Sequence, residues 1–348
     1  MKKERLFYLD FIRAISTLII VITHYNAVFF WGRTPGTELW SKLVTPKDVF
    51  NLYIGNLGVS LFFIISGAAM MYVYGQKDKI DLKTFFKKRF MSLYPMFWIA
   101  YIACFLYLFY VNKGFSTSVP YWRFIFTAIG FDGYLATFTS TFYLLGEWFL
   151  GCIVLIYLVM PFLIKAVKKK PLLTFVISLV VYILLVLFYK LPLPISVVIF
   201  TRLPEVIFGM LFVAYIKKVK VAYLLPSLAV LALNTVLAPH INDSFQTTYV
   251  GIATFLVLVF ISQFFKFAVA ENICSEIGKY SYAIFLVHHQ VISQITSKFN
   301  LDTLTRGNSY VLFLLCLSVT FILSKILFDT EKYLMSHVFR KYCIEGIL

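Results

Sequence analysis

The chain has 348 residues, of which 61% are hydrophobic and only 14% are charged. Soluble globular proteins average about 25% charged residues, so this composition excludes a single water-soluble domain and indicates a membrane protein. The formal net charge of +16 is carried by short basic clusters between apolar stretches. Such clusters are typical of loops that face anionic lipid, and they argue against a nucleic-acid partner.

Ten apolar stretches are long enough to cross a bilayer, which requires about 20 helical residues. In chain order the predicted spans are 6–30, 53–75, 90–111, 142–164, 172–189, 195–216, 221–238, 247–265, 280–297 and 309–328. The first stretch is too long for the apolar region of a signal peptide, so we expect it to be retained. The segment 120–141 is aromatic, rich in Thr and interrupted by glycines, and it predicts an outer loop.

The lysines and arginines are distributed unevenly between the two sets of connecting segments. With the N-terminus inside, 22 of them fall in cytoplasmic segments and nine, Arg202 among them, in outer segments. This asymmetry follows the positive-inside rule for an even number of spans. We therefore expect an all-α, polytopic protein of the cytoplasmic membrane, with about ten transmembrane helices and both termini cytoplasmic. It should form a single membrane domain over residues 1–348, with no appended soluble domain.

The first span contains ionisable side chains that hydrocarbon disfavours, namely Asp10, Arg13 and His24. Each such group costs at least about 2.5–3.5 kcal/mol at a helix centre. Arg13 and His24 are eleven residues apart, almost three helical turns, so they share one face and lie about 16 Å apart along the axis. Asp10 is one turn from Arg13 and can pair with it. These polar residues form a stripe along one face of the helix, which favours a channel or cleft in which His24 acts as general base. Two alternatives stay open: His24 can bond a carbonyl of a neighbouring helix, and Arg13 can extend its charged group to the membrane interface.

Six short motifs occur in order over residues 5–290. They are Leu9-Asp10-Phe11-Ile12-Arg13 followed by His24, the run 58–67, the run 86–98 with Lys88-Arg89 and Tyr94-Pro95, Glu147-Trp148-Phe149-Leu150 with Tyr157 and Pro161, Arg202-Leu203-Pro204-Glu205 with 208–210, and the run 281–288 that ends at His288. Together they resemble the acyltransferase 3 family of integral-membrane proteins, which acylate mainly carbohydrate hydroxyls. Ser92 departs from the family pattern, which usually has a second arginine at that position.

The resemblance implies a membrane-bound O-acyltransferase that uses cytoplasmic acetyl-CoA or another acyl-CoA as co-substrate, without a metal. The implied acceptor is a hydroxyl of an extracytoplasmic or lipid-linked carbohydrate. For this reaction we expect His24 and Glu147 to take part in catalysis, with Glu147 orienting a base or the acceptor. We expect Arg13, Lys88 and Arg89 to bind the coenzyme A phosphates, and Tyr282 and His288 to contact the acceptor.

Each implied role has a structural alternative. Lys88 and Arg89 can be plain cytoplasmic charge, Glu147 can pair with Arg202, Glu205 can be a helix-start charge, and Tyr282 and His288 can bond another helix. The reaction can also pass through an acyl-histidine. Other classes left open are an exporter of a polysaccharide or its precursor and a structural or sensory membrane protein.

Overall fold

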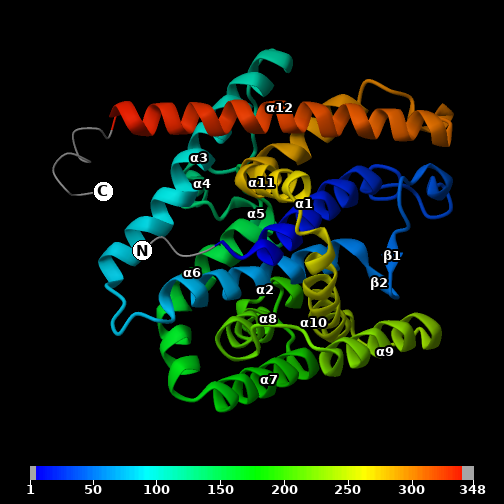
Figure 1. The fold of residues 1–348 in the computed structure, drawn as a ribbon. Helices are drawn as coiled ribbons and strands as arrows, with labels where there is room; N and C mark the ends of the chain where they lie inside the picture. The colour runs from blue at the N-terminus through cyan, green and yellow to red at the C-terminus, as the bar shows by residue number, and fades with distance from the viewer. Residues whose placement is uncertain (1–4, 339–348) are drawn as a thin grey trace. The chain divides into compact units, whose positions relative to one another are not determined.

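The computed structural model describes residues 5–338, which form long helices and one short β-hairpin (Figure 1). The strands are β1 (Asp48–Val49) and β2 (Leu52–Tyr53). The helices are α1 (Phe7–Ala27), α2 (Ile54–Tyr74), α3 (Leu82–Val111), α4 (Phe124–Ala128), α5 (Asp132–Leu135), α6 (Glu147–Lys169), α7 (Pro171–Phe188), α8 (Ile199–Leu211), α9 (Val221–Leu237), α10 (Asp243–Ser262), α11 (Ala268–Thr296) and α12 (Arg306–Val338). A π-helix (Phe212–Ile216) continues α8.

Within residues 5–338, eight helices are long and apolar enough to cross a membrane: α1, α2, α3, α6, α7, α8 with its π-helical continuation, α10 and α12. The all-α, polytopic membrane class is therefore confirmed. Of the other two predicted spans, the one in α9 is apolar but has only 17 residues. The one in α11 belongs to a 29-residue helix whose first half carries several polar residues. The total of ten spans and the cytoplasmic location of the termini stay predictions.

Several helices begin at other residues than the predicted spans. α3 begins at Leu82, so Lys88 and Arg89 lie on the helix itself. α6 begins at Glu147 rather than at residue 142, because Gly146 (φ 93°) and Glu147 (φ 40°) take left-handed conformations that end helical geometry there. Hydropathy marks only the part of a helix suited to hydrocarbon, whereas backbone hydrogen bonds continue through polar turns. The predicted outer loop 120–141 contains the two short helices α4 and α5.

The chain packs as two compact units, each built from two separate parts of the sequence. Unit 1 comprises Met1–Leu82 and Cys152–Ser281, and unit 2 comprises Lys83–Gly151 and Tyr282–Leu348. α6 and α11 each contribute residues to both units.

The centre of unit 1 is α2, which packs against α1, α8 and α10. Two glycines allow α2 and α8 to cross at backbone contact. A Cβ atom at Gly67 would lie 1.9 Å from the carbonyl oxygen of Val206, and one at Gly209 would lie 1.9 Å from that of Ile64. Small residues at such crossings let helix backbones approach closely, which is a main source of packing energy between membrane helices.

The same helix, α8, buries a pair of opposite charges. Arg202 and Glu205 are 4% and 0% exposed, and the Nε–Oε2 distance between them is 3.2 Å. The guanidinium also lies over the ring of Phe63, 4.8 Å from its centroid. The sequence placed Arg202 in an outer segment and offered Glu205 as a helix-start charge. The helix-start role of Glu205 is wrong, because α8 begins at Ile199, six residues earlier. Arg202 lies within α8 rather than in a connecting segment, and its location on the outer side stays a prediction. A charge inside a packed bundle requires a partner, and one helical turn supplies it here.

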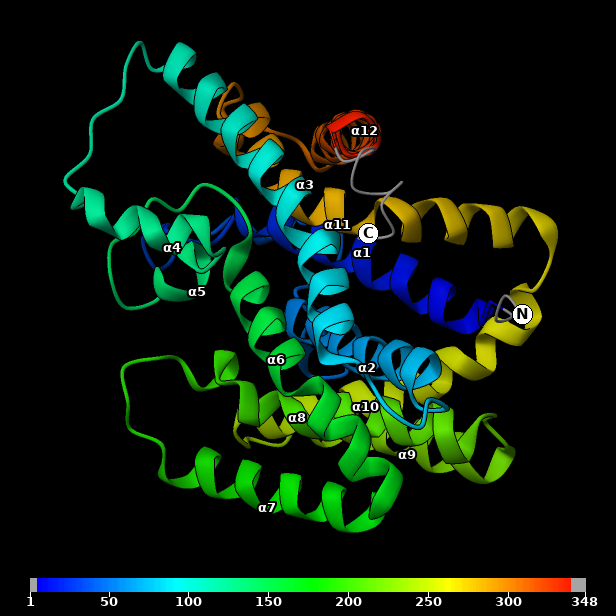
Figure 2. The same ribbon diagram turned by 90° about the vertical axis from the view of Figure 1, so that its left-hand side faces the viewer.

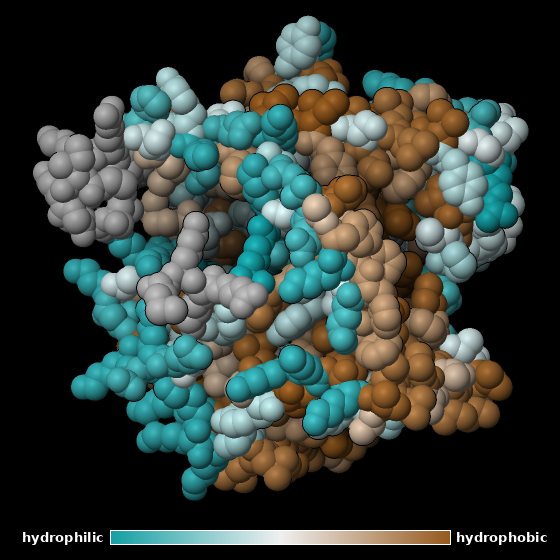
Figure 3. Space-filling model, viewed as in Figure 1, coloured by the Kyte–Doolittle hydropathy of each residue, from teal (hydrophilic) through white to brown (hydrophobic). Residues whose placement is uncertain are grey.

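The outer helices of unit 1 expose apolar side chains that water would disfavour. α7 packs beside α8 (Figures 1 and 2). Its exposed residues include Leu172 (72%), Ile177 (55%) and Leu187 (61%). A continuous apolar face of this kind is stable when lipid covers it. Hydrophilic residues gather instead on the left side of the view in Figure 3, over the region where α2 and α6 end.

Candidate functional site

The seven residues that the sequence predicts for the site divide between the two units. Unit 1 holds Arg13 and His24, and unit 2 holds Lys88, Arg89, Glu147, Tyr282 and His288.

In unit 1, α1 carries Arg13 and His24 on one continuous helix. α1 has neither Pro nor Gly between Phe7 and Ala27, so the helical period is uninterrupted and the predicted common face is present. Between them, the Thr17 hydroxyl donates to the backbone oxygen of Arg13 at 2.8 Å. The Arg13 side chain is 31% exposed. The polar stripe on α1 is therefore a property of the folded helix.

The basic end of the stripe is organised around Asp10. Its carboxylate forms an ion pair with Arg5, and its Oδ1 lies 3.9 Å from the Arg13 guanidinium. Arg5 also donates to the Ser275 hydroxyl on α11 at 2.7 Å. The predicted Asp10–Arg13 pair is thus confirmed. Two guanidinium groups share one carboxylate, which leaves one positive charge in excess and favours an anionic ligand.

His24 has a ring arrangement suited to accepting a proton. Its Nδ1 lies 3.0 Å from the backbone oxygen of Ile20, one turn earlier on the same helix. A carbonyl oxygen can only accept a hydrogen bond, so Nδ1 carries the hydrogen of the neutral ring. The lone pair then resides on Nε2, which is the state that a general base requires. The sequence left open a bond from His24 to a carbonyl of a neighbouring helix, whereas this bond lies within α1 itself.

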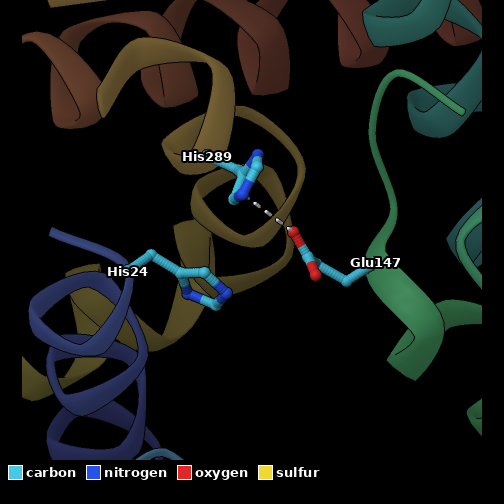
Figure 4. Close-up of side chains that lie close together, drawn as sticks. All are labelled: His24, Glu147 and His289. Carbon is cyan, nitrogen blue, oxygen red and sulfur yellow. Dashed lines mark ion pairs between the residues drawn. The ribbon is translucent and has the colours of Figure 1, made fainter. Parts of the chain in front are cut away.

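In unit 2, Glu147 at the start of α6 faces His289 on α11. Figure 4 shows the two side chains pointing toward each other, and the His289 Nε2 lies 3.8 Å from the Glu147 Oε1. The Tyr143 hydroxyl donates to the same carboxylate oxygen at 2.9 Å. The Glu147 side chain is 17% exposed, and that of His289 is 41% exposed. A carboxylate, an imidazole and a phenol therefore meet at a site that solvent or a ligand can reach.

The backbone around Glu147 is held in an unusual conformation. Its φ of 40° costs a non-glycine residue about 1–3 kcal/mol, and such strain persists where surrounding contacts impose it. Gly133 on α5 lies directly against it, since a Cβ there would be 2.4 Å from the Glu147 carbonyl carbon. Gln290, next to His289, donates to the Leu144 backbone oxygen at 2.8 Å. Strained residues of this kind cluster at functional sites.

His289 is a site candidate that sequence reasoning missed. The family motif ends at His288, and His289 showed no signal other than being a second histidine in a membrane helix. His288 is fully buried, and its Nδ1 lies 3.0 Å and 2.9 Å from the backbone oxygens of Ile284 and Phe285 on its own helix. The acceptor-contact role of His288 stays a prediction, while His289 is the histidine that meets a carboxylate.

The remaining predicted residues of unit 2 lie on or against α3. The Tyr282 hydroxyl donates to the Leu93 backbone oxygen at 3.0 Å, which is the inter-helix bond that the sequence left open. Lys88 is exposed and Arg89 is partly buried, both near the basic start of α3. Ser92, where the family usually has arginine, donates to the Arg89 backbone oxygen at 2.9 Å and contributes no charge.

Glu147 does not form the ion pair that the sequence left open as an alternative to a role in catalysis. The partner proposed for it was Arg202, but Arg202 forms its ion pair with Glu205. The Glu147 carboxylate instead faces the His289 imidazole, with 3.8 Å between Oε1 and Nε2.

Comparison with known proteins identifies the family of this chain. The family model described as "Acyltransferase domain" matches residues 6–329. The chain is also similar to "Protein 2 in picA locus" from Rhizobium radiobacter, with 34% identity over 100 residues, which cover 28% of this chain and 42% of that protein. No solved structure matches the chain. Because the family model covers nearly the whole sequence, the chain belongs to the acyltransferase 3 family.

Proposed function

We propose that the protein is a membrane-bound O-acyltransferase that moves an acetyl group from acetyl-CoA to a hydroxyl of a carbohydrate. Membership of the acyltransferase 3 family carries this proposal. The family resemblance supplies the donor and the acceptor class. In the same proposal the protein resides in the cytoplasmic membrane, with both termini on the donor side.

His24 acts as the general base in this mechanism. Its Nε2 removes the proton of the acceptor hydroxyl as the oxygen attacks the thioester carbonyl carbon. The new carbon–oxygen ester bond forms, the carbon–sulfur bond breaks, and the departing coenzyme A thiolate takes the proton from the imidazolium. The Nδ1 bond to Ile20 supports this role because it fixes the tautomer in which Nε2 is basic. Arg13, Lys88 and Arg89 contribute positive charge toward the donor phosphates.

Glu147 binds the acceptor. A carboxylate accepts hydrogen bonds from sugar hydroxyls, and one involving a charged group contributes about 1.5–3 kcal/mol. His289 and Tyr143 act as positioning residues, because both contact the Oε1 atom of the carboxylate. The left-handed backbone at Glu147 supports this role, since its strain is maintained by the packing of Gly133.

The test uses purified protein in detergent micelles with acetyl-CoA and a panel of carbohydrate acceptors. Release of the coenzyme A thiol and the mass of the acceptor are measured together. Wild type should release thiol in proportion to acylated acceptor, and His24→Ala should lose both by at least 100-fold, because base catalysis contributes about 10²–10⁴-fold.

His240→Ala is the matched control, since His240 is an exposed residue between α9 and α10. It should retain wild-type transfer. Full transfer by a well-folded His24→Ala protein would remove His24 from the mechanism. Movement of a polysaccharide across vesicles without thiol release would favour the exporter instead.

A further inference from the structure

Unit 1 contains a pocket that the proposed mechanism does not use. Its volume is about 480 Å³, within the range of about 300–1,000 Å³ that is usual for small-molecule sites. Four segments form it: the N-terminal end of α1, the C-terminal ends of α2 and α6, and the π-helix after α8. The same region of the surface is hydrophilic in Figure 3. We call it the lysine pocket, after Lys168 and Lys217 in its lining.

The lining combines positive charge with flat and apolar surface. Beside the two lysines it contains Tyr8, Tyr72 and Tyr215, together with aliphatic side chains such as Leu6 and Met71. None of the described residues that line it carries a carboxylate. A cation would therefore find no counter-charge here, whereas an anion would find two ammonium groups.

Several contacts hold the lining in place before any ligand arrives. The Lys168 Nζ donates to the Lys77 backbone oxygen at 2.8 Å, which fixes the long side chain. The Tyr215 hydroxyl donates to the Val167 backbone oxygen at 3.2 Å, so its ring is anchored. The Tyr8 ring packs edge-on against Phe212, with 5.8 Å between centroids. Prior ordering of side chains reduces the entropy that binding would otherwise cost.

The backbone at Lys217 is a second, independent sign of a functional site. Phe212–Ile216 is a π-helix, and isolated π-helical turns occur frequently at functional sites. Lys217 directly follows with φ 63°, a strained conformation for a lysine. Its N–H donates to the Phe212 backbone oxygen at 2.7 Å, which stabilises the wide turn. The strain brings a lysine to the pocket where an unstrained helix would continue past it.

We propose that the lysine pocket binds the phosphate group of an amphiphilic ligand, with Lys168 and Lys217 as the phosphate contacts. Two lysines favour a phosphate or diphosphate over a neutral sugar, and the tyrosines and aliphatic residues accommodate the rest of the molecule. The same chemistry is offered by the phosphates of coenzyme A and by the headgroup of an anionic phospholipid. The inference concerns binding alone and does not depend on acyl transfer.

The experiment measures binding to the purified full chain in neutral detergent by calorimetry, with free coenzyme A and short-chain phosphatidylglycerol as separate probes. The variant K168Q/K217Q keeps side-chain length and removes both charges. The matched control K169Q/K218Q removes the same charge from adjacent exposed lysines outside the lining. We expect the pocket variant to weaken at least one probe by 10-fold or more, with the control within 2-fold of wild type.

Loss of coenzyme A binding alone assigns the pocket to the acyl donor, and loss of phosphatidylglycerol binding alone assigns it to lipid. Equal binding of both probes by wild type and K168Q/K217Q would overturn the proposal, as would an equal loss in K169Q/K218Q. Size-exclusion profiles and thermal unfolding midpoints of all three proteins exclude misfolding as the cause. The His24→Ala assay stays separate, so failure of one proposal leaves the other intact.

Discussion

Replacing a glycine at the crossing of α2 and α8 should destabilise the protein strongly. In Gly67→Ala the new methyl group would lie 1.9 Å from the Val206 backbone oxygen. An ordinary contact begins near 3.4 Å, so the two helices must separate by about 1.5 Å. Because the obstructing atom is backbone, no side-chain rotation can relieve the clash. Overpacking typically costs about 1–3 kcal/mol, and we expect the upper end for Gly67→Ala and for Gly209→Ala.

The double variant gives a sharper test of this geometry. Gly67 and Gly209 each oppose the backbone of the other helix, at Val206 and Ile64 respectively. One separation of the helices therefore relieves both clashes. The double variant Gly67→Ala/Gly209→Ala should therefore lose much less free energy of unfolding than the two single variants lose together. The departure from additivity should be about 1–3 kcal/mol.

The assay is reversible unfolding in mixed micelles, followed by circular dichroism, with the free energy of unfolding extrapolated to zero denaturing detergent. Gly307→Ala is the control, because the nearest atom to its Cβ would be the Thr305 hydroxyl oxygen at 3.8 Å, an ordinary contact. It should match wild type or gain slightly from the better helix propensity of alanine. The close crossing would be refuted if the single variants had free energies of unfolding within about 0.5 kcal/mol of wild type. It would also be refuted if the losses of the two single variants were strictly additive in the double variant.

Two further predictions concern carboxylates of unit 2. Asp132 is 1% exposed, and burial raises its pKa to about 6, from about 3.9 in an unfolded chain. Between about pH 4 and pH 6 the folded state thus binds more protons than the unfolded chain does. The ionisable Asp132 therefore lowers the stability of the fold as pH rises through that window. Asp132→Asn should raise the thermal unfolding midpoint above that of wild type only slightly at pH 4, and by a larger, constant amount above about pH 7. A rise in the midpoint that is the same at every pH would contradict this. In the acylation assay, Glu147→Gln should raise the acceptor KM by about 10-fold or more while the donor KM stays unchanged, whereas Glu38→Gln should alter neither; an unchanged acceptor KM would exclude acceptor binding by Glu147.

The class of protein and the stripe on α1 could be predicted because both depend on local sequence. Composition alone excludes a soluble fold, and ten apolar stretches predict helices that the structure contains. The spacing of Arg13 and His24 fixes a common face once the segment is helical, whatever surrounds it. Helix limits were less accurate, since polar turns at the start of α3 continue a helix that hydropathy does not mark.

The pairing of side chains could not be predicted in the same way. Sequence offered Arg202 as a partner for Glu147, but Arg202 pairs with Glu205 inside α8 and Glu147 meets His289. The lysine pocket likewise requires the ends of α1, α2, α6 and α8 to converge.

Periodicity and hydropathy are properties of one segment, so the sequence by itself determined the membrane class, the helices and the polar face of α1. A contact between distant segments depends on how their backbones pack. The glycines at 67 and 209 and the left-handed turn at Glu147 set that packing here. Only the tertiary structure therefore decided which carboxylate faces which imidazole and where two lysines line a pocket.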